Sequence, residues 1–451
     1  MTRAATSLDD LPVTGFHRRI TLLGAGGPFC DGYILGIIAV ALTLVTPDLR
    51  LDAVWTGLIG ASSIIGMFAG GLVFGYLTDV LGRRKMYTLD LLVFVVMSVL
   101  QLFVSNAAEL FAIRLVMGVA IGADYPIATS MVAEFVPTKR RGPSLALLDM
   151  SFFIGNFASY AVGYALVGTG AWRWILATSA VPAFVLMLLR IGIPESPRWL
   201  LSKGRDAEAR AVIDKHLGTG VTISEGPVVA KPAWRHFGDL FRGGYGRRTA
   251  FVSVFWICIV APAFAIHTFQ PTLLELLHVS NPVLATLVIM ALSVVGCALG
   301  FFLVNSLGRR RLLLYSFVLT AVALYLLSGL GVLGVLGALV IVVLFCVYNL
   351  AESAGSVLEF VYPNELFPTH LRATAVGFAT AMSRLGGAVG TFLLPVLYAT
   401  VGVNASIALF GLFLILGLVA TAVWAPETKD KSLAEAGRVT PAALGDRKEM
   451  A

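Results

Sequence analysis

Six ionisable side chains interrupt the long apolar stretches of this chain: Asp31, Arg114, Asp124, Glu352, Glu359 and Arg384. A charged group inside a bilayer costs about 2.5–3.5 kcal/mol on insertion scales, so such groups usually face a cavity, pair with one another or relay protons. Burial disfavours the charged form of a carboxyl group. Asp31 and Asp124 are therefore candidate proton carriers beside Arg114, and a purely structural ion pair between Asp31 and Arg114 is the competing interpretation.

Further polar side chains in the apolar stretches are candidates for contacting a small polar ligand: Asn156, His267, Gln270, Glu359 and Arg384. Amide groups suit the hydroxyl groups of a sugar, and the planar guanidinium of Arg384 suits a carboxylate. A lone histidine in an apolar stretch is more often a packing residue, which is the competing interpretation for His267. The four cysteines lie singly, without Cys-x-x-Cys pairs or histidine clusters, so we expect no metal site and no cofactor.

The composition places these residues in a membrane protein. The 451-residue chain is 58% hydrophobic and only 13% charged, whereas soluble domains carry about 25% charged residues. Twelve mostly apolar runs are long enough to cross the hydrocarbon core as helices, which takes about 20 residues each. They lie near residues 20–47, 54–78, 86–104, 110–133, 144–167, 174–193, 250–274, 282–307, 312–329, 331–358, 373–398 and 403–425.

Six spans, a polar stretch and six more spans define the expected organisation. Residues 1–193 form an N-terminal six-helix bundle, 194–248 a central cytoplasmic loop, 249–430 a C-terminal six-helix bundle and 431–451 a cytoplasmic tail. Residues 1–12 are polar, so no cleavable signal peptide is expected before the first span. Glycine pairs at helix-packing spacing, such as Gly66 with Gly70 and Gly118 with Gly122, predict close contacts between spans.

Basic residues gather in short clusters between the apolar runs, at 83–85, 139–141 and 309–311. This pattern is typical of cytoplasmic loops and not of a nucleic-acid-binding surface, despite the net charge of +7. With both termini in the cytoplasm, every Lys and Arg falls on the cytoplasmic side or near it except Arg50, Arg114, Arg173, Arg190 and Arg384. We therefore expect an integral protein of the cell (inner or plasma) membrane.

Three segments of the first half recur in the second half at a nearly constant offset. Residues 79–84 (DVLGRR) return as 305–310 (NSLGRR), 134–141 (EFVPTKRR) as 365–372 (ELFPTHLR), and 194–196 (PES) as 426–428 (PET). Each member of a pair ends an equivalent predicted span. Two homologous halves with a site between them are a common plan of transporters.

These motifs carry a family resemblance. The strings at 75–84 (GYLTDVLGRR), 114–118 (RLVMG), 122–126 (GADYP), 194–200 (PESPRWL) and 364–368 (NELFP) resemble those of the major facilitator superfamily. The likeness is closest to its sugar-porter, phosphate:proton and aromatic-acid:proton symporter branches, and to bacterial metabolite transporters. It implies an all-α polytopic fold of twelve transmembrane helices in two pseudo-symmetric six-helix bundles.

The resemblance implies a gate at the cytoplasmic ends of the helices. In this superfamily the 75–84 string latches the outward-facing state, which assigns gating roles to Gly75, Asp79, Gly82, Arg83 and Arg84; a simple topology signal is the competing interpretation. The resemblance also implies salt-bridge networks that break and re-form during transport. They would contain Glu134 with Arg141, and Glu365 with Arg372. Surface pairs are worth only about 0–1 kcal/mol, which suits a reversible gate.

The resemblance also bears on coupling and substrate. Asp31 lies in Asp31-Gly-Tyr and Asp124 in Gly-Ala-Asp-Tyr-Pro, both similar to symporter motifs in which the aspartate takes part in proton transfer. The phosphate symporters that this chain resembles carry an aspartate in the seventh span, whereas this chain has His267 and no aspartate there, so phosphate is a poor candidate substrate. The second aspartate of the aromatic-acid pattern is also missing, because Ile34 stands in its place.

The expected function is secondary active transport of a small polar metabolite, an organic acid or a sugar, by proton symport with alternating access. A proton-independent facilitator or an exporter of the same fold is the alternative. No nucleophile or metal constellation indicates an enzyme, and the G-x-x-x-x-G-K-[ST] motif of an ATP-driven pump is absent. The expected partners are the substrate, protons and the lipid bilayer, and we expect a monomer that binds no nucleic acid.

Overall fold

The computed structural model describes residues 6–7, 11–219, 221–222, 238–242, 244–334, 337–431 and 435. Within that part, twelve helical spans are long and apolar enough to cross a membrane, which confirms the predicted all-α membrane fold. The first six spans are α1 (Gly15–Asp48), α2 (Ala53–Leu81), α3 (Arg83–Leu100), α4 (Ala107–Phe135), α5 (Thr138–Val167) and the pair α6 (Trp172–Ala177) with α7 (Ala180–Leu189). The others are α10 (Tyr245–Leu276), α11 (Pro282–Ser306), α12 (Arg309–Val332), α13 (Ala338–Leu366), α14 (Thr369–Thr400) and α15 (Val403–Trp424).

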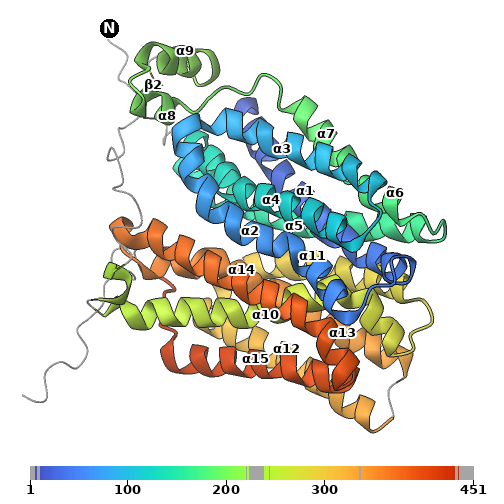
Figure 1. The fold of residues 1–451 in the computed structure, drawn as a ribbon. Helices are drawn as coiled ribbons and strands as arrows, with labels where there is room; N and C mark the ends of the chain where they lie inside the picture. Colours follow the sequence, from blue (N-terminus) through green and yellow to red (C-terminus); the bar gives the residue numbers. More distant parts are fainter. Residues whose placement is uncertain are drawn as a thin grey trace, which may run out of the picture.

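Short elements lie between the sixth and seventh spans and beside the start of α1. They are α8 (Pro197–Ser202), α9 (Asp206–His216) and the strand β2 (Val221–Thr222), which pairs in parallel with β1 (Thr6–Ser7). Phe16 of α1 stacks on His216 of α9 with 4.7 Å between ring centroids. Helix α9 therefore packs against the first half, at the top of the molecule in Figure 1.

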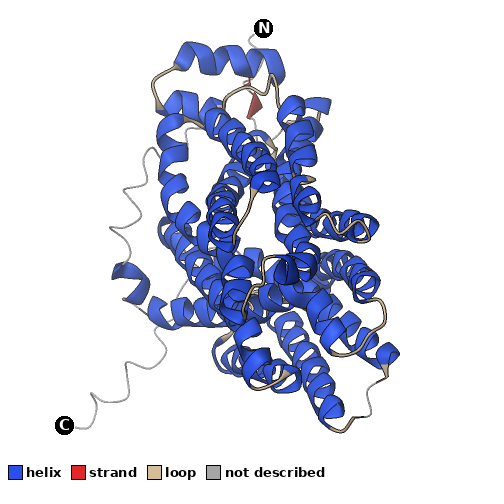
Figure 2. Ribbon diagram, turned by 45° about the vertical axis from the view of Figure 1, so that its right-hand side comes forward, coloured by secondary structure: helices blue, strands red, loops and turns tan. Residues whose placement is uncertain are grey.

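The helices fall into two groups that lie side by side in Figures 1 and 2, α1 to α7 and α10 to α15. In the first group α1 packs on α5 and α2 on α4, and in the second α10 packs on α14 and α11 on α13. The same pairing in both groups agrees with the repeated sequence segments. Contacts between the groups join α2 to α14, α5 to α11 and α1 to α10.

Glycines allow the closest helix contacts within each half. A Cβ on Gly66 of α2 would lie 2.2 Å from Leu115 O of α4, and one on Gly118 of α4 would lie 2.0 Å from Ser63 O of α2. The equivalent contact in the second half is made by Gly296 of α11, whose Cβ would lie 2.4 Å from Leu350 O of α13. The predicted packing role of these glycines is confirmed, because any side chain there would force the backbones apart.

The boundary between the ninth and tenth spans was wrong in the sequence-based assignment. Helix α12 continues through Gly329 and Gly331 to Val332, and α13 begins only at Ala338 and runs to Leu366. Gly331 packs against Asn404 of α15, whose Oδ1 would lie 2.4 Å from a Cβ at this position, whereas nothing lies within 4 Å of a Cβ at Gly329. The two glycines therefore do not break the helix, and one of them marks a close contact with another helix.

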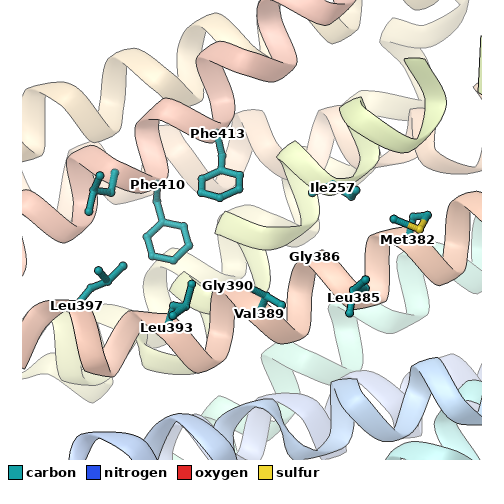
Figure 3. A pocket seen from close by; sticks show the side chains of 11 residues that line it. Ile257, Met382, Leu385, Gly386, Val389, Gly390, Leu393, Leu397, Phe410 and Phe413 are labelled. Carbon is teal, nitrogen blue, oxygen red and sulfur yellow. The ribbon is translucent and has the colours of Figure 1, made fainter. Parts of the chain in front are cut away.

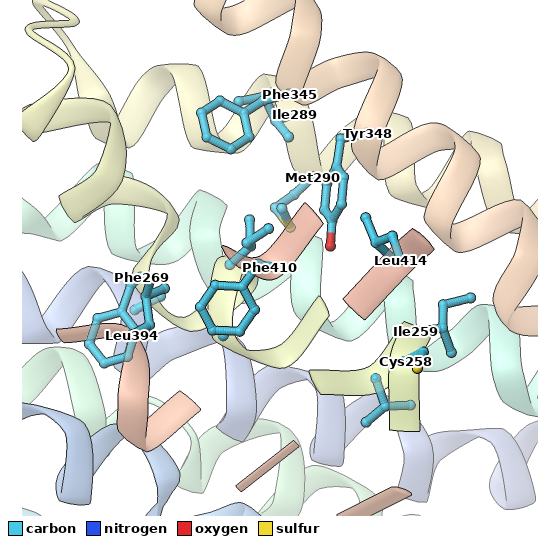
Figure 4. Packing of buried hydrophobic residues seen from close by; sticks show 14 of the residues in the cluster. Cys258, Ile259, Phe269, Ile289, Met290, Phe345, Tyr348, Leu394, Phe410 and Leu414 are labelled. Atoms are coloured by element: carbon cyan, nitrogen blue, oxygen red, sulfur yellow. The ribbon is translucent and has the colours of Figure 1, made fainter. Parts of the chain in front are cut away.

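The largest apolar core fills the second half and continues into the outer part of the first. Figure 4 shows part of it, with Phe269 of α10, Phe345 and Tyr348 of α13 and Phe410 of α15 facing one another. A second core lies between α1, α3, α4 and α7. It surrounds the charged side chains described next.

Candidate functional site

A buried cluster of charged side chains lies inside the first half, where α1, α3, α4 and α7 meet. It contains Asp31, Asp90, Asp124 and Arg190, none of which is more than 6% exposed. Arg190 Nη1 lies 3.9 Å from Asp90 Oδ2, and Arg190 Nη2 lies 3.9 Å from Asp124 Oδ1. Both predicted proton carriers are thus grouped with two residues that the sequence alone does not place in a site.

Backbone carbonyl groups hold Arg190 in place. Its Nη1 donates to Tyr87 O at 3.0 Å and its Nη2 to Leu23 O at 3.1 Å. The guanidinium also stacks over the Tyr87 ring, 3.3 Å from the centroid, and the Tyr87 hydroxyl donates to Leu23 O at 3.2 Å. Arg190 therefore connects α1, α3 and α7 and sets a fixed positive charge between Asp90 and Asp124.

The competing interpretation, an ion pair between Asp31 and Arg114, is wrong for the described structure. Arg114 is fully buried, and its Nη2 reaches α1 at Ile34, donating to the carbonyl oxygen at 3.3 Å. Asp31 Oδ1 has no hydrogen-bond partner, and neither do Arg114 Nε and Nη1. The reason is position: Arg114 meets α1 nearly one turn beyond Asp31, whose charge interacts with Asp124, Asp90 and Arg190.

Asp124 is pressed against the backbone of α1. A Cβ on Gly27 would lie 2.0 Å from Asp124 Oδ2, so only glycine leaves room for the carboxyl group at this point. On the opposite side of the same helix, a Cβ on Gly32 would lie 2.0 Å from Phe152 O of α5. Gly27 and Gly32 thus allow α1 to pack closely against both α4 and α5 on either side of Asp31.

His267 of α10 lies where the two halves meet. Its Nε2 is 2.8 Å from Asn349 Oδ1 and 3.7 Å from Glu352 Oε2, both of α13. Its backbone carbonyl accepts a hydrogen bond from the hydroxyl of Tyr160 of α5 at 2.6 Å, which ties the halves together. The ring is thus a satisfied polar group, and a ligand that binds it must compete with Asn349.

Glu359 of α13 and Arg384 of α14 face the same region of the second half. Glu359 Oε2 accepts a hydrogen bond from Trp256 Nε1 of α10, and the charges of Glu359 and Arg384 interact. The Arg384 guanidinium lies 5.5 Å from the ring centroid of Phe264 of α10. Three helices of one half therefore bring an acid, a guanidinium and aromatic rings together.

The two predicted amide ligands are placed differently. Gln270 is fully buried in α10, and neither its Oε1 nor its Nε2 has a hydrogen-bond partner among the described residues. Asn156 lies on α5 against α1, with its Nδ2 3.2 Å from the position of a Cβ on Gly36. Only Gln270 shares a helix with His267, so the predicted substrate residues are divided between the halves.

A glutamate caps the third helix of each half at the end of the molecule that carries Arg83 and Arg309, here called the arginine end. Glu195 accepts hydrogen bonds from the backbone N–H groups of Arg83 and Arg84 at 3.1 and 3.2 Å. Glu427 does the same for Arg309 and Arg310 at 3.0 and 3.2 Å. The repeated Pro-Glu-Ser and Pro-Glu-Thr segments therefore supply carboxylates to helix N-termini, where negative charge is favourable.

The predicted gating glycine Gly82 and its counterpart Gly308 make these caps possible. Their φ angles are +100° and +85°, which favour glycine, and a Cβ on Gly82 would lie 2.6 Å from Glu195 Oε2. Arg84, another predicted gating residue, contributes its backbone N–H to the cap. The side chains of Gly75, Asp79 and Arg141 lie outside the described residues.

The two acids of the predicted salt-bridge networks pair with the arginines at the start of the third helix of each half. Glu134 Oε1 lies 3.4 Å from Arg83 Nη2, and Glu365 Oε1 lies 2.6 Å from Arg309 Nη2. The expected pair of Glu365 with Arg372 is therefore wrong for this structure, since Arg372 Nε donates to its own helix end at Phe367 O. The reason is that the acids at the ends of α4 and α13 face the capped start of the third helix, where Arg83 and Arg309 lie.

Replacing Glu427 with glutamine should lower the stability of the purified protein. Partial burial opposes ionisation of Glu427, but four backbone N–H donors hold its pKa below the usual value. Its stabilising contribution is thus complete above the ordinary glutamate pKa and is lost as the pH falls through the lowered folded value. Loss of a helix cap costs about 0.5–2 kcal/mol. Thermal unfolding at neutral and acid pH measures this.

The matched control for this prediction is Glu208→Gln on α9. Glu208 pairs only with the neighbouring exposed Arg205, so its loss should change the unfolding temperature much less. Equal effects of the two substitutions, or an effect of Glu427→Gln that persists at acid pH, would contradict the capping role.

Comparison with known proteins identifies the family. The chain matches the family described as "Sugar (and other) transporter" over residues 20–439. The chain belongs to this family. The inner membrane metabolite transport protein YgcS of Escherichia coli (strain K12) is 39% identical over 441 residues, covering 97% of this chain and 98% of YgcS. The niacin transporter NiaP of Acinetobacter baylyi is 27% identical over 438 residues, covering 95% and 98% of the two chains.

A solved structure shares the fold. The xylose transporter XylE from Escherichia coli, in a partially occluded inward-open conformation, matches with a TM-score of 0.79 and 21% sequence identity. The match covers 93% of this chain and 100% of that one. The family member described here therefore has the major facilitator fold, is an integral membrane protein, and belongs among transporters and not enzymes.

An apolar pocket of this transporter lies apart from the charged groups. Figure 3 shows it between α10, α14 and α15, lined by Ile257, Gly386, Gly390 and Phe410 among others. None of its lining residues has a polar side chain, and Leu385 and Val389 at its edge are exposed. A polar metabolite would find no hydrogen-bond partner there, so this pocket is not the candidate substrate site.

Sequence reasoning missed several residues that the structure brings into the sites of this transporter. Asp90 and Arg190 belong to the charged cluster, Asn349 and Trp256 contact the predicted substrate residues, and Glu195 caps α3. Asp90 and Arg190 both interrupt apolar runs, which was the available signal. Their pairing could not be read from spacing, because they lie on different helices far apart in the chain.

Proposed function

We propose that this transporter moves a small polar metabolite, an organic acid or a sugar, by proton symport with alternating access. The observation that carries the proposal is the buried group of Asp31, Asp90 and Asp124 around one arginine in the first half. Buried carboxyl groups that exceed the nearby cations are favoured in the neutral form, which requires a bound proton. The coupling residues are then Asp31 and Asp124, with Arg114 as a buried cation nearby.

The arginine end is proposed to face the cytoplasm, as are both termini, because basic clusters mark cytoplasmic loops. The pairs Arg83–Glu134 and Arg309–Glu365 would break and re-form there as the halves move. Their side chains are about 15% exposed, and both pairs lie at helix ends. Gly75, Asp79 and Arg141 are proposed to take part in the same gate, and the protein is proposed to act as a monomer.

The substrate is proposed to bind where the halves meet, in contact with His267, Gln270, Glu359, Arg384 and Asn156. Arg384 favours an organic anion over a neutral sugar, since its guanidinium offers two parallel donors to a carboxylate. Glu359 is the competing partner of Arg384, because their charges already interact. A thermal-shift screen of the purified protein against metabolites, followed by uptake into proteoliposomes with an imposed pH gradient, tests the proposal.

Replacing Arg384 with lysine distinguishes the two partners. If the substrate carboxylate binds Arg384, the lysine variant should bind about 10–100-fold more weakly, because a charge-assisted hydrogen bond is worth about 1.5–3 kcal/mol. If Glu359 is the partner, Arg384→Ala should instead destabilise the protein by about 3–5 kcal/mol, because a buried acid is left unpaired. Calorimetric binding and thermal unfolding measure the two effects, and unchanged binding in a folded lysine variant would exclude the anion.

A further inference from the structure

The carboxyl groups of the buried cluster outnumber its cations. Asp90 and Asp124 lie beside a single guanidinium, that of Arg190, and the charge of the third acid, Asp31, also interacts with it. Arg190 lies 3.9 Å from each of the two acids that it pairs with, because its N–H groups are directed to Leu23 O and Tyr87 O. One distant cation cannot compensate three ionised carboxylates in a water-poor interior.

The hydrogen bonding of these acids is incomplete in a specific way. Among the described residues, neither oxygen of Asp124 has a hydrogen-bond partner and Asp90 Oδ2 has none, although both side chains are almost completely buried. Both carboxyl groups lie beside the same guanidinium, Asp90 Oδ2 at 3.9 Å from Nη1 and Asp124 Oδ1 at 3.9 Å from Nη2 of Arg190. An ionised carboxylate only accepts hydrogen bonds, whereas a protonated one also donates. One added proton therefore supplies the donor that both groups lack.

We propose that Asp90 and Asp124 form a proton-binding site in which one proton is shared between the two carboxyl groups and Arg190 compensates the remaining negative charge. Asp31, at the middle of α1, is not part of this proton-binding site. The physiological meaning of this site rests on the proposed proton symport.

Groups on each neighbouring helix act on the pair. Cys30 and Asp31 face it from α1, Tyr87 from α3 and Arg190 from α7, and Arg384 of α14 acts on Asp31 from the other half. Loss of the shared proton leaves two carboxylates competing for Arg190. Because Arg190 holds Leu23 of α1 and Tyr87 of α3, deprotonation acts directly on the contact between these helices.

Infrared spectroscopy of the full-length purified protein tests the site without any substrate. Protonated carboxyl groups have a C=O stretching band of their own, and isotope-labelled aspartate shifts the band if an aspartate carries the proton. We expect the wild type to retain such an aspartate band at neutral pH. Asp90→Asn and Asp124→Asn should each remove or shift this same band, since both residues hold one proton.

Asp149→Asn is the matched control, because Asp149 of α5 is a half-buried aspartate that contacts Cys297 of α11 and lies outside the cluster. It should leave the band of the pair unchanged. Absence of the band in the wild type, or a band that survives either single substitution unaltered, would overturn the proposal. Asp90→Glu keeps a carboxyl group and should shift the band rather than abolish it, which serves if an asparagine variant does not fold.

A transport assay separates this site from the proposed function. Once the metabolite screen has identified a substrate, its uptake can be measured with an imposed pH gradient. Uptake by the wild type that does not respond to the gradient would count against symport and leave the infrared result unaffected. A normal proton response with no effect of Asp90 or Asp124 on the band would instead count against the shared proton alone.

Discussion

Replacing Asp31 with asparagine is expected to abolish accumulation driven by a proton gradient while exchange of substrate across the membrane continues. One proton moving through about 100 mV supplies about 2.3 kcal/mol, enough for about 50-fold accumulation of a neutral substrate. Asparagine keeps the size of the side chain but cannot carry a proton. Because Asp31 Oδ1 has no hydrogen-bond partner to lose, the variant should remain folded.

The measurement is uptake into proteoliposomes with and without an imposed pH gradient, together with counterflow at equal pH. Asp52→Asn is the matched control, since Asp52 is an exposed cap of α2 whose side chain accepts a hydrogen bond from Trp55 N. Asparagine caps a helix about as well as aspartate. Accumulation by Asp31→Asn that matches the control would remove Asp31 from the coupling mechanism.

Replacing Gly57 with tryptophan should prevent the halves from closing at the end opposite the arginine end. A Cβ on Gly57 of α2 would lie 2.3 Å from Phe392 O of α14, so backbone meets backbone there with no side chain that could give way. Overpacking a well-packed contact costs about 1–3 kcal/mol or more. We therefore expect a loss of the closed arrangement of about 5- to 150-fold, and a comparable loss of transport.

Spin labels on cysteines at positions 52 and 401 would report the change as a longer distance between the ends of α2 and α14. Gly168→Trp is the matched control, because Gly168 lies at the same end with nothing within 4 Å of a Cβ and with an ordinary φ of −62°. Equal distances in both variants and the wild type would mean that the Gly57 contact does not determine closure.

The local pattern of the sequence determined the spans. An apolar run of about 20 residues must form a helix in lipid, because no water is present to satisfy its backbone groups. This rule depends on no contact between distant residues, so it predicted all twelve spans, and it failed only where α12 continues past Gly329 and Gly331. There Gly331 packs against Asn404 of another helix, a contact that spacing along the chain does not reveal.

The motifs likewise predicted which residues gather at the arginine end, but they did not predict which glutamate forms a salt bridge with which arginine. Repetition placed Glu134, Glu365 and the Pro-Glu segments at equivalent helix ends. Their partners Arg83 and Arg309 are the first residues of the third helix of each half. Residues near one another in sequence, such as Glu365 and Arg372, were the natural expectation, yet helix geometry turned Arg372 toward Phe367 O.

The sequence by itself determined that Asp31 and Asp124 interrupt apolar helices, and that buried carboxyl groups of this kind need compensation. Only the tertiary structure decided that the compensating group is Arg190, held by Leu23 O and Tyr87 O, and that Asp90 joins the cluster. The physical reason is that charge compensation acts over a few ångströms in space. Spacing along the chain cannot reveal which side chains of α1, α3, α4 and α7 meet at that range.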